Sequence, residues 1–238
     1  MKRHFILIGA PGVGKGTFSA MLCKMNTTWE TFSVGEQLRH EVSAGSALGG
    51  QVKSYLEHGR MIPDAITNRI VVDYLKNAST TGAPSTKTII LDGYPRSVAQ
   101  MEALLSFGDA NKMTFVAINI KLEKWVTTEK LLGRQQCKKC GASFNSAHIV
   151  ERGYDMPAII PDAKTCRLNF PYNVTSCTPE IVFRSDDTRE AIANRFEEFE
   201  SKTAPVLEFL RSKKLLRDFN VLRGVRDIHL LQELMLTS

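Results

Sequence analysis

The sequence of this 238-residue chain has no apolar run long enough to cross a membrane, and it contains no internal repeat and no low-complexity segment. Only four residues precede the first apolar run, which leaves no room for a secretory leader. We therefore expect a globular, cytoplasmic protein. At this length the chain can bury a core of its own, so we expect one domain, with or without insertions.

Long runs of lysine and arginine are also missing, although the 31 basic residues outnumber the 25 acidic ones and give a formal net charge of +6. A protein that binds nucleic acid gathers its basic residues on one face, one helix or one loop. Here they are scattered along the chain, so we expect neither nucleic acid nor a membrane as a partner. A polyphosphate ligand held by the lysines and arginines of one cleft explains the positive charge more simply.

Cysteine is scarce, and we expect the five cysteines to be thiols because nothing points to an oxidising compartment. Four of them lie in one stretch: Cys137, Cys140, Cys166 and Cys177. The first two have the spacing of one half of a structural zinc site, but ten residues separate the other two, where a close pair is expected. His148 could supply a missing ligand. The default expectation is unmetallated thiols, with a structural Zn²⁺ as the alternative.

Glycine, in contrast, is concentrated in one loop. An apolar run, a glycine-rich loop and a helical segment follow one another at residues 5–8, 9–17 and 17–25. In such a loop successive backbone N–H groups turn toward one point, and the helix that follows adds its positive end, which makes an anion cradle. Lys15 supplies the mobile charge for β- and γ-phosphates that the pattern G-x-x-x-x-G-K-[ST] requires. Gly16 stands where the usual hydroxyl residue follows, and Thr17 comes one place later.

The rest of the chain alternates between predicted strands and predicted helices. We expect strands at residues 5–8, 29–32, 88–91, 114–120 and 215–220, and helices at 17–25, 64–77, 98–107, 123–132, 187–210 and 225–236, with two short helices before Gly59. This alternation is typical of an α/β fold with a parallel sheet. Asp92 directly follows a buried strand, at the edge where such sheets bind ligands, and is predicted to orient a hydrated Mg²⁺.

Two features near the carboxyl end carry further expectations. Segment 133–187 shows no sustained period and is expected to be an inserted lobe. After it, Asp187 and Glu190 have the spacing of a capping box, and Pro205 should kink the long helix that they begin. Arg195 lies on the apolar stripe of that helix, where a charge needs an anionic partner.

These residues together resemble the adenylate kinase family, in its form with a long lid. The resemblance rests on the glycine loop and on further motifs in family order: Gly35 with Arg39, Leu91-Asp92-Gly93-Tyr94-Pro95-Arg96 with Gln100, Gly133-Arg134, and Arg184-Ser185-Asp186-Asp187 with Arg195. It covers nearly the whole chain, and the Gly16 departure is itself a family feature.

The resemblance implies a P-loop NTPase-type parallel sheet flanked by helices, formed by residues 1–32, 63–132 and 188–238. A small helical lobe, residues 33–62, would close on AMP, and a lid, residues 133–187, would close on ATP. The implied reaction is the reversible, Mg²⁺-dependent transfer of a phosphoryl group from ATP to AMP, which gives two ADP and serves nucleotide homeostasis. Such enzymes are often monomers.

The resemblance also assigns roles residue by residue. The residues implied in ATP binding are Gly12, Val13, Gly14, Lys15, Gly16, Thr17 and Arg134. Those implied in AMP binding are Val34, Arg39, Arg60, Ile62, Gly93, Arg96, Gln100, Arg184 and Arg195. The implied catalytic set is Lys15, Arg96, Arg134, Arg184 and Arg195, with Asp92 at the metal. Because an AMP phosphate is already an anion, the reaction needs alignment and charge compensation and no general base.

Two departures from the family leave the base sites open. Val34 stands where threonine is usual, and Lys130 stands near the donor base where arginine is common and where lysine offers no planar group for stacking. A GTP:AMP kinase or another nucleoside monophosphate kinase is therefore the nearer alternative. The remote alternative, a nucleic-acid-binding module, predicts strongly salt-dependent oligonucleotide binding and no ADP formation.

Overall fold

The computed structural model describes residues 2–80, 87–161, 166, 177–184 and 186–237. Within these ranges its helices are α1 (Lys15–Met25), α2 (Val34–Ser43), α3 (Ala47–Glu57), α4 (Asp64–Thr80), α5 (Val98–Ala110), α6 (Lys124–Leu132), α7 (Arg189–Glu198), α8 (Ala204–Ser212) and α9 (Ile228–Leu236). Its strands are β1 (Lys2–Ile8), β2 (Trp29–Ser33), β3 (Thr88–Asp92), β4 (Met113–Lys121), β5 (Arg134–Cys137), β6 (Ser143–Asn145), β7 (Ile181–Phe183) and β8 (Leu216–Asn220). No helix among the described residues is both long and apolar enough to span a membrane.

The centre of the molecule is a five-stranded parallel sheet in the order β2-β3-β1-β4-β8. Strand β1 lies in the middle and is buried on both faces. Its side chains alternate, so that Phe5 and Leu7 join one hydrophobic cluster while Ile6 and Ile8 join another. Parallel strands need crossover connections, and the helices that supply them cover both faces of the sheet.

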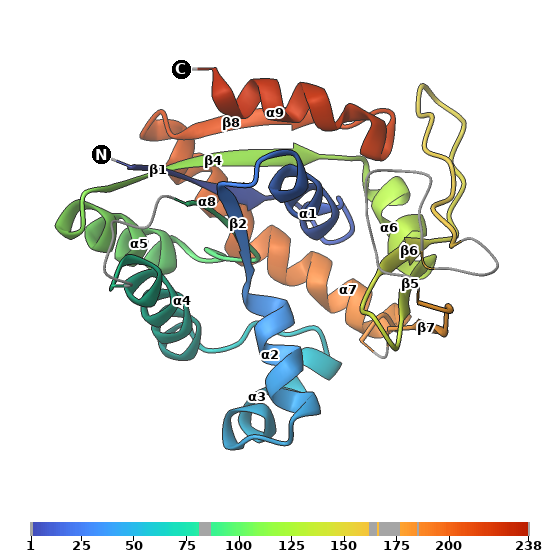
Figure 1. Ribbon diagram of the computed structural model, residues 1–238, viewed down its shortest axis with the longest axis horizontal. Coiled ribbons are helices and arrows are strands. Elements are labelled where there is room, and N and C mark those ends of the chain that lie inside the picture. The colour runs from blue at the N-terminus through green and yellow to red at the C-terminus, as the bar shows by residue number, and fades with distance from the viewer. Residues whose placement is uncertain (1, 81–86, 162–165, 167–176, 185, 238) are drawn as a thin grey trace.

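The two hydrophobic clusters correspond to two helical layers (Figure 1). Helices α1 and α9 pack on one face through Phe18, Met21 and Leu231. Helices α4, α5 and α8 pack on the other face. This confirms the predicted α/β fold with a P-loop NTPase-type parallel sheet. The strand carboxyl ends are left open between the layers.

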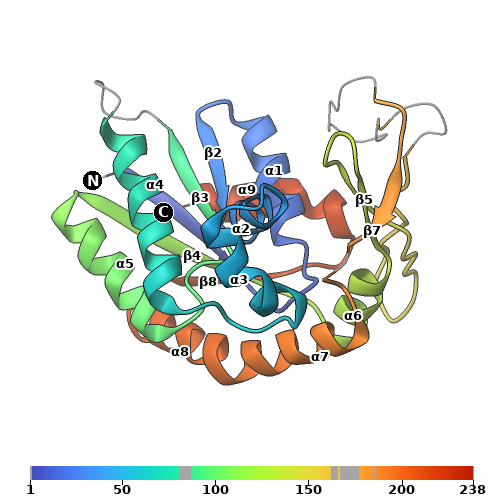
Figure 2. The same cartoon turned by 90° about the horizontal axis from the view of Figure 1, so that it is seen from below.

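Two smaller lobes extend beyond those carboxyl ends. Helices α2 and α3 form a helical lobe that projects from the end of β2, and the antiparallel sheet β6-β5-β7 lies on the other side, beside α6 (Figures 1 and 2). The predicted boundaries of these lobes, 33–62 and 133–187, stay predictions, because parts of the second range lie outside the described residues.

The start of α7 corrects one local expectation. Thr188, and not Asp187, caps the helix, because its hydroxyl accepts a hydrogen bond from the Ala191 N–H at 3.1 Å. Asp187 is instead bound to arginines. Near Pro205 the predicted kink takes the form of a π-helical turn, Phe199–Thr203, between α7 and α8.

Candidate functional site

The glycine loop connects β1 to α1 and is packed closely against α6. A Cβ atom on Gly12 would lie 2.5 Å from the carbonyl oxygen of Thr127, and the φ of Gly12 is +88°. No other residue type fits this position without moving α6. Gly14, at φ 89°, ends the loop as the N-cap of α1, with no side chain to satisfy the first helical N–H groups. The loop backbone and the positive end of α1 are therefore presented together.

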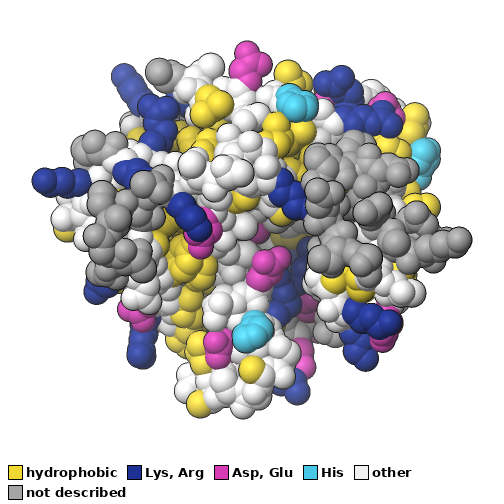
Figure 3. Space-filling view, in the orientation of Figure 1, with side chains coloured by type: hydrophobic (Ala, Val, Ile, Leu, Met, Phe, Trp, Pro, Cys, Tyr) yellow, Lys and Arg dark blue, Asp and Glu magenta, His cyan; other side chains and the backbone are white. Residues whose placement is uncertain are grey.

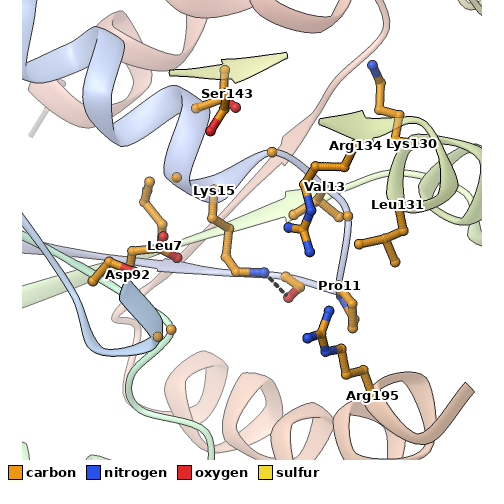
Figure 4. Close-up of a pocket in the computed structure, with 18 of the residues that line it drawn as sticks. Leu7, Pro11, Val13, Lys15, Asp92, Lys130, Leu131, Arg134, Ser143 and Arg195 are labelled. Carbon is orange, nitrogen blue, oxygen red and sulfur yellow. Dashed lines mark hydrogen bonds between the residues drawn. The ribbon is translucent and has the colours of Figure 1, made fainter. Parts of the chain in front are cut away.

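Lys15 reaches back across this loop. Its Nζ donates hydrogen bonds to the carbonyl oxygens of Gly9, at 2.8 Å, and Ala10, at 3.0 Å. Burial lowers the pKa of Lys15, Asp92 acts in the opposite direction and the neighbouring arginines lower it as well, and together they bring it to about 8. Figure 4 shows Lys15, Arg134 and Arg195 pointing into the same space. An anion in that space would be strongly favoured.

Asp92 ends β3, at the position predicted from the sequence, and only 9% of it is exposed. A Cβ on Gly16 would lie 3.2 Å from its Oδ2 atom. Glycine at position 16 thus leaves room for the carboxylate where the usual P-loop has a hydroxyl residue. The arrangement gives an oxygen ligand beside the start of α1, which is the type of ligand that Mg²⁺ prefers.

Three arginines from separate parts of the chain meet at two adjacent aspartates. Arg134 donates from Nε to Asp187 at 2.7 Å, and Arg184 donates from Nε to Asp186 at 3.0 Å. Arg195 bonds both aspartates. Burial acts to raise the pKa of Asp186, but the adjacent Arg184 and Arg195 guanidinium groups hold it well below its usual range. The predicted anionic partner of Arg195 is therefore this aspartate pair.

Two further arginines approach from the end of β3 and from the small lobe. Arg96 follows β3, and its Nε donates to the Gly93 carbonyl at 2.9 Å. Burial lowers its pKa, with Asp92 acting in the opposite direction. Arg39, from α2, lies 3.8 Å from Asp186, and burial together with Arg184 lowers its pKa to about 10. Arginine side chains from the sheet edge and from the small lobe thus lie around the same cavity as Lys15.

Lys15, Asp92 and the five arginines line one cavity of about 450 Å³, a volume within the range of small-ligand sites. The glycine loop lies in its middle. One end is lined by the small lobe, with Tyr55, Gly59 and Met61, and the other by Lys130 and Val225 beside the lid. Figure 3 shows basic side chains in the hollow above the small lobe, and others spread over the outer surface of this face.

The cavity collects most of the residues that the sequence predicted. Its lining includes Gly12, Val13, Gly14, Lys15, Gly16, Thr17, Arg39, Arg60, Asp92, Gly93, Arg96, Arg134, Arg184 and Arg195. It does not include Val34, Ile62 or Gln100, which are buried beside it. The Gln100 side chain accepts from the Arg96 N–H at 2.7 Å and donates to Asp64 at 2.7 Å. Gln100 therefore holds the Arg96 backbone in place, and its predicted contact with a nucleotide stays a prediction.

Other lining residues were not predicted. Tyr55 and Met61 line the small-lobe end, and Ile159 and Val221 line the other end. Val221 directly follows β8, so the strand-end rule that identified Asp92 could also have identified it. Ile159 gave no signal, because it lies outside the helices and strands and its backbone is placed by a hydrogen-bonded bridge to Asn145 at the end of β6.

The thiols of the lid come together, which their spacing in the sequence did not predict. The Sγ atoms of Cys137, Cys140, Cys166 and Cys177 all lie within 4.8 Å of one another, and His148 is not in this group. Cys137 and Cys177 have their Sγ atoms 3.8 Å apart, close to the edge of about 3.8 Å in a tetrahedron of four thiolates at the Zn–S bond length. Hydrogen bonds from the backbone of Glu180 and Cys140 lower the pKa of the Cys137 thiol to about 6, which favours the ligating thiolate.

Comparison with known proteins adds an independent finding. A family model described as "Adenylate kinase" matches residues 7–215. The chain is 34% identical over 227 residues to a "GTP:AMP phosphotransferase" of Plasmodium falciparum, covering 94% of this chain and 92% of that protein. It is 34% identical to an "Adenylate kinase" of Geobacillus sp. (94% and 93% covered) and 35% identical to one of Methanocella arvoryzae (94% of each).

Proposed function

This chain belongs to the adenylate kinase family and is therefore a phosphotransferase, and we propose that it transfers the γ-phosphoryl group of ATP reversibly to AMP, with Mg²⁺, to give two ADP. The observation that supports this most strongly is the convergence of Lys15, Arg96, Arg134 and Arg195 on the open end of the glycine loop. Two nucleotides can lie end to end in the cavity, with their phosphates meeting at these cations.

The donor triphosphate is bound in the middle of the cavity. The backbone N–H groups of residues 12–17 hold its phosphates, and Lys15 leaves the loop carbonyls to pair with the β- and γ-phosphates. Mg²⁺, when bound, neutralises phosphate charge and aligns the donor, and Asp92 and Thr17 are the residues that would hold it with its waters. Arg134 adds a bidentate donor from the base of the lid.

The acceptor nucleotide is bound between β3 and the small lobe. Arg39, Arg60, Gly93 and Arg96 line this end, and Val34, Ile62 and Gln100 support it from behind. Arg184 and Arg195 would exchange their aspartate partners for phosphate oxygens. Because water would compete with AMP for the phosphoryl group, the lobes on either side of the cavity should exclude it before transfer.

The reaction itself needs no general base from this chain. The attacking oxygen of AMP is an anion at neutral pH, so the work of the protein is to bring it in line with the γ-phosphoryl and to compensate the charge that develops. Four of the five proposed catalytic cations are arginines, at positions 96, 134, 184 and 195. Arginine suits this purpose better than lysine, because its planar guanidinium group bonds two phosphate oxygens at once.

We propose ATP in preference to GTP as the donor, with nucleotide homeostasis in the cytoplasm as the role, and a monomer that binds neither nucleic acid nor membrane. The relative named a GTP:AMP phosphotransferase keeps GTP as the alternative. A coupled assay with ATP or GTP as donor and AMP, CMP or UMP as acceptor tests the choice. ADP formation that is fastest with ATP and AMP is expected; faster turnover with GTP would favour the alternative, and no transfer with any pair would overturn the proposed function.

The four lid thiols fit a structural Zn²⁺, which we propose they hold. The mutual distances of the four Sγ atoms suit tetrahedral ligation, and two of the four cysteines are buried. Cys137 ends β5 and Cys140 follows in the next turn, while Cys166 and Cys177 come from the chain before β7. Such an ion would tie the lid strands together where the local hydrophobic cluster of described residues has three fully buried members, Cys137, Phe144 and Cys166. It would take no part in phosphoryl transfer.

A further inference from the structure

A hairpin that follows the lid strand β6 is packed on the core of the molecule. Ile149 and Met156 pair as antiparallel partners, with hydrogen bonds of 2.9 and 2.7 Å between their backbones. In Figure 1 this hairpin, residues 149–156, rises in yellow from β6 toward the turn between β8 and α9. It lies within the segment that the sequence assigned to the lid, yet its contacts are with other elements.

The apolar side chains of hairpin 149–156 belong to the cluster under α1 and α9. Ile149, Tyr154 and Met156 are 5%, 8% and 1% exposed, and all three join the cluster that contains Val221 and Val225. Removal of such apolar surface from water is stabilising. Apolar packing thus attaches the hairpin to the core.

Polar contacts fix its position along two elements. The Asp155 N–H donates to the carbonyl oxygen of Leu222 at 2.9 Å, and the Asp155 carboxylate accepts from Arg226 at 2.6 Å. The Tyr154 hydroxyl donates to Glu123 at 3.2 Å, just before α6. The indole of Trp125 meets the Tyr154 ring edge to face, at 5.7 Å between centroids. The hairpin therefore bridges the start of α6 and loop 221–227.

Loop 221–227 is the part of the core that forms the donor end of the cavity. Val221, Gly224 and Val225 line the cavity there. Gly224 has φ +58°, and a Cβ on it would lie 3.5 Å from the Met156 side chain, so the hairpin covers the outer side of the turn. From below, the Asp227 carboxylate accepts from the Leu222 and Arg223 N–H groups, each at 2.8 Å. The loop is held between Asp227 and the hairpin.

We propose that hairpin 149–156 is a positioning element for the donor nucleotide: Met156, Tyr154 and Asp155 hold loop 221–227 in the shape that receives the donor base. The inference rests on the proposed function, because it takes the end of the cavity beyond Lys130 as the donor base site. Since its hydrogen bonds among the described residues go to the start of α6 and to loop 221–227, it acts on the donor and leaves the acceptor site unchanged. It also acts before phosphoryl transfer, so it governs donor affinity and not the rate with both sites filled.

Substitution of Met156 by alanine, compared with the same change at Met235, tests this inference. Both methionines are fully buried in the same cluster, but Met235 lies at the far end of α9. Titration calorimetry with ATP alone and with AMP alone gives affinities that do not depend on turnover. Met156→Ala should weaken ATP binding by about tenfold, leave AMP binding unchanged, and raise the KM for ATP with kcat retained.

A second variant guards against a fold defect in the first. Asp155 is half exposed, so Asp155→Ala should fold normally, and it should weaken ATP binding by about threefold. Equal ATP affinities in Met156→Ala, Asp155→Ala and the unaltered protein would overturn the inference, as would an equal loss in Met156→Ala and Met235→Ala. If the unaltered protein bound ATP but formed no ADP, only the proposed function would fail, because the binding comparison would still stand.

Discussion

At the scale of single residues, Lys15 and Arg96 are the cations whose roles can be tested most directly. Each lines the cavity, and neither is part of the hydrophobic core. Lys15→Ala and Arg96→Ala should therefore lower kcat by at least about a hundredfold while the melting temperature changes little. Lys53→Ala, an exposed cation of α3, is the matched control and should leave both unchanged. Normal turnover in the Lys15 or Arg96 variant would remove that residue from the mechanism.

The protonation of Lys15 should also set the alkaline limb of the pH profile. Burial first, and neighbouring arginines second, lower its pKa from 10.5 to about 8 in the ligand-free protein. The charged form that binds phosphate is present below this pKa and is lost as the pH rises through it, and kcat/KM reports free-enzyme pKa values. We expect kcat/KM for ATP to fall above pH 8, where the nucleotide phosphates no longer titrate.

Lys15→Arg provides the comparison for that profile, because a guanidinium group stays charged throughout the range. Its kcat/KM should be lower at neutral pH, since arginine cannot occupy the space of the lysine in the loop, but the decline above pH 8 should be absent. The same alkaline limb in both proteins would assign the titration to another group.

Several of these residues could be predicted because each position imposes its own physical requirement. Glycines beside a lysine after a strand indicate phosphate, Asp92 lies at a strand end, and Arg195 on an apolar stripe needs an anion. Which residue supplies that anion could not be predicted from the neighbouring sequence alone. Asp187 had the right spacing for a capping box, but Thr188, one place later, is an equally good capping residue. In the structure Thr188 caps the helix. The Asp187 carboxylate instead accepts hydrogen bonds from Arg134 and Arg195, which are distant contacts that spacing does not reveal.

At the scale of elements, the lid sheet offers a test of the metal proposal. Protein purified without chelator should contain one Zn²⁺ per chain by elemental analysis. Cys177→Ser should lose the ion and lower the melting temperature by about 5 °C, because the metal would no longer link β5 to the chain before β7. Cys23→Ser is the control, since Cys23 lies in α1 away from the thiol cluster. Metal-free native protein with normal stability would contradict the proposal.

The lid also shows why the spacing of the cysteines in the sequence did not predict that the four thiols meet. Cys166 and Cys177 are separated by a stretch that lies outside the described residues, and only the pairing of β5 with β7 brings the chain back to the first two thiols. Hairpin 149–156 was not predicted from the sequence for a related reason. Its apolar residues are too few to give a period, and their partners are about seventy residues away in the sequence.

At the scale of the whole molecule, the order of the sheet explains why distant motifs meet. Strands β3, β1 and β4 lie side by side, so the loops that follow them open at one edge. The alternation of strands and helices predicted this layered core. The path of the lobes could not be predicted, because it depends on contacts such as that of Arg39 with Asp186, which joins the small lobe to the segment entering α7.

The aspartate pair suggests that ligand-free stability and nucleotide binding are linked across the molecule. The Asp187 side chain is nearly fully buried and bonds Arg134 and Arg195, so Asp187→Asn removes the carboxylate partner of Arg134 and one of the two carboxylate partners of Arg195. Breaking a buried ion pair of this kind should lower the free energy of unfolding of the ligand-free protein by about 3 kcal/mol. Phosphates bring that anion back, so ATP with AMP should raise the melting temperature of Asp187→Asn more than that of the unaltered protein. Asp73→Asn, an exposed aspartate of α4, should show neither effect. Equal shifts with nucleotide in all three proteins would mean that these arginines do not exchange carboxylate for phosphate.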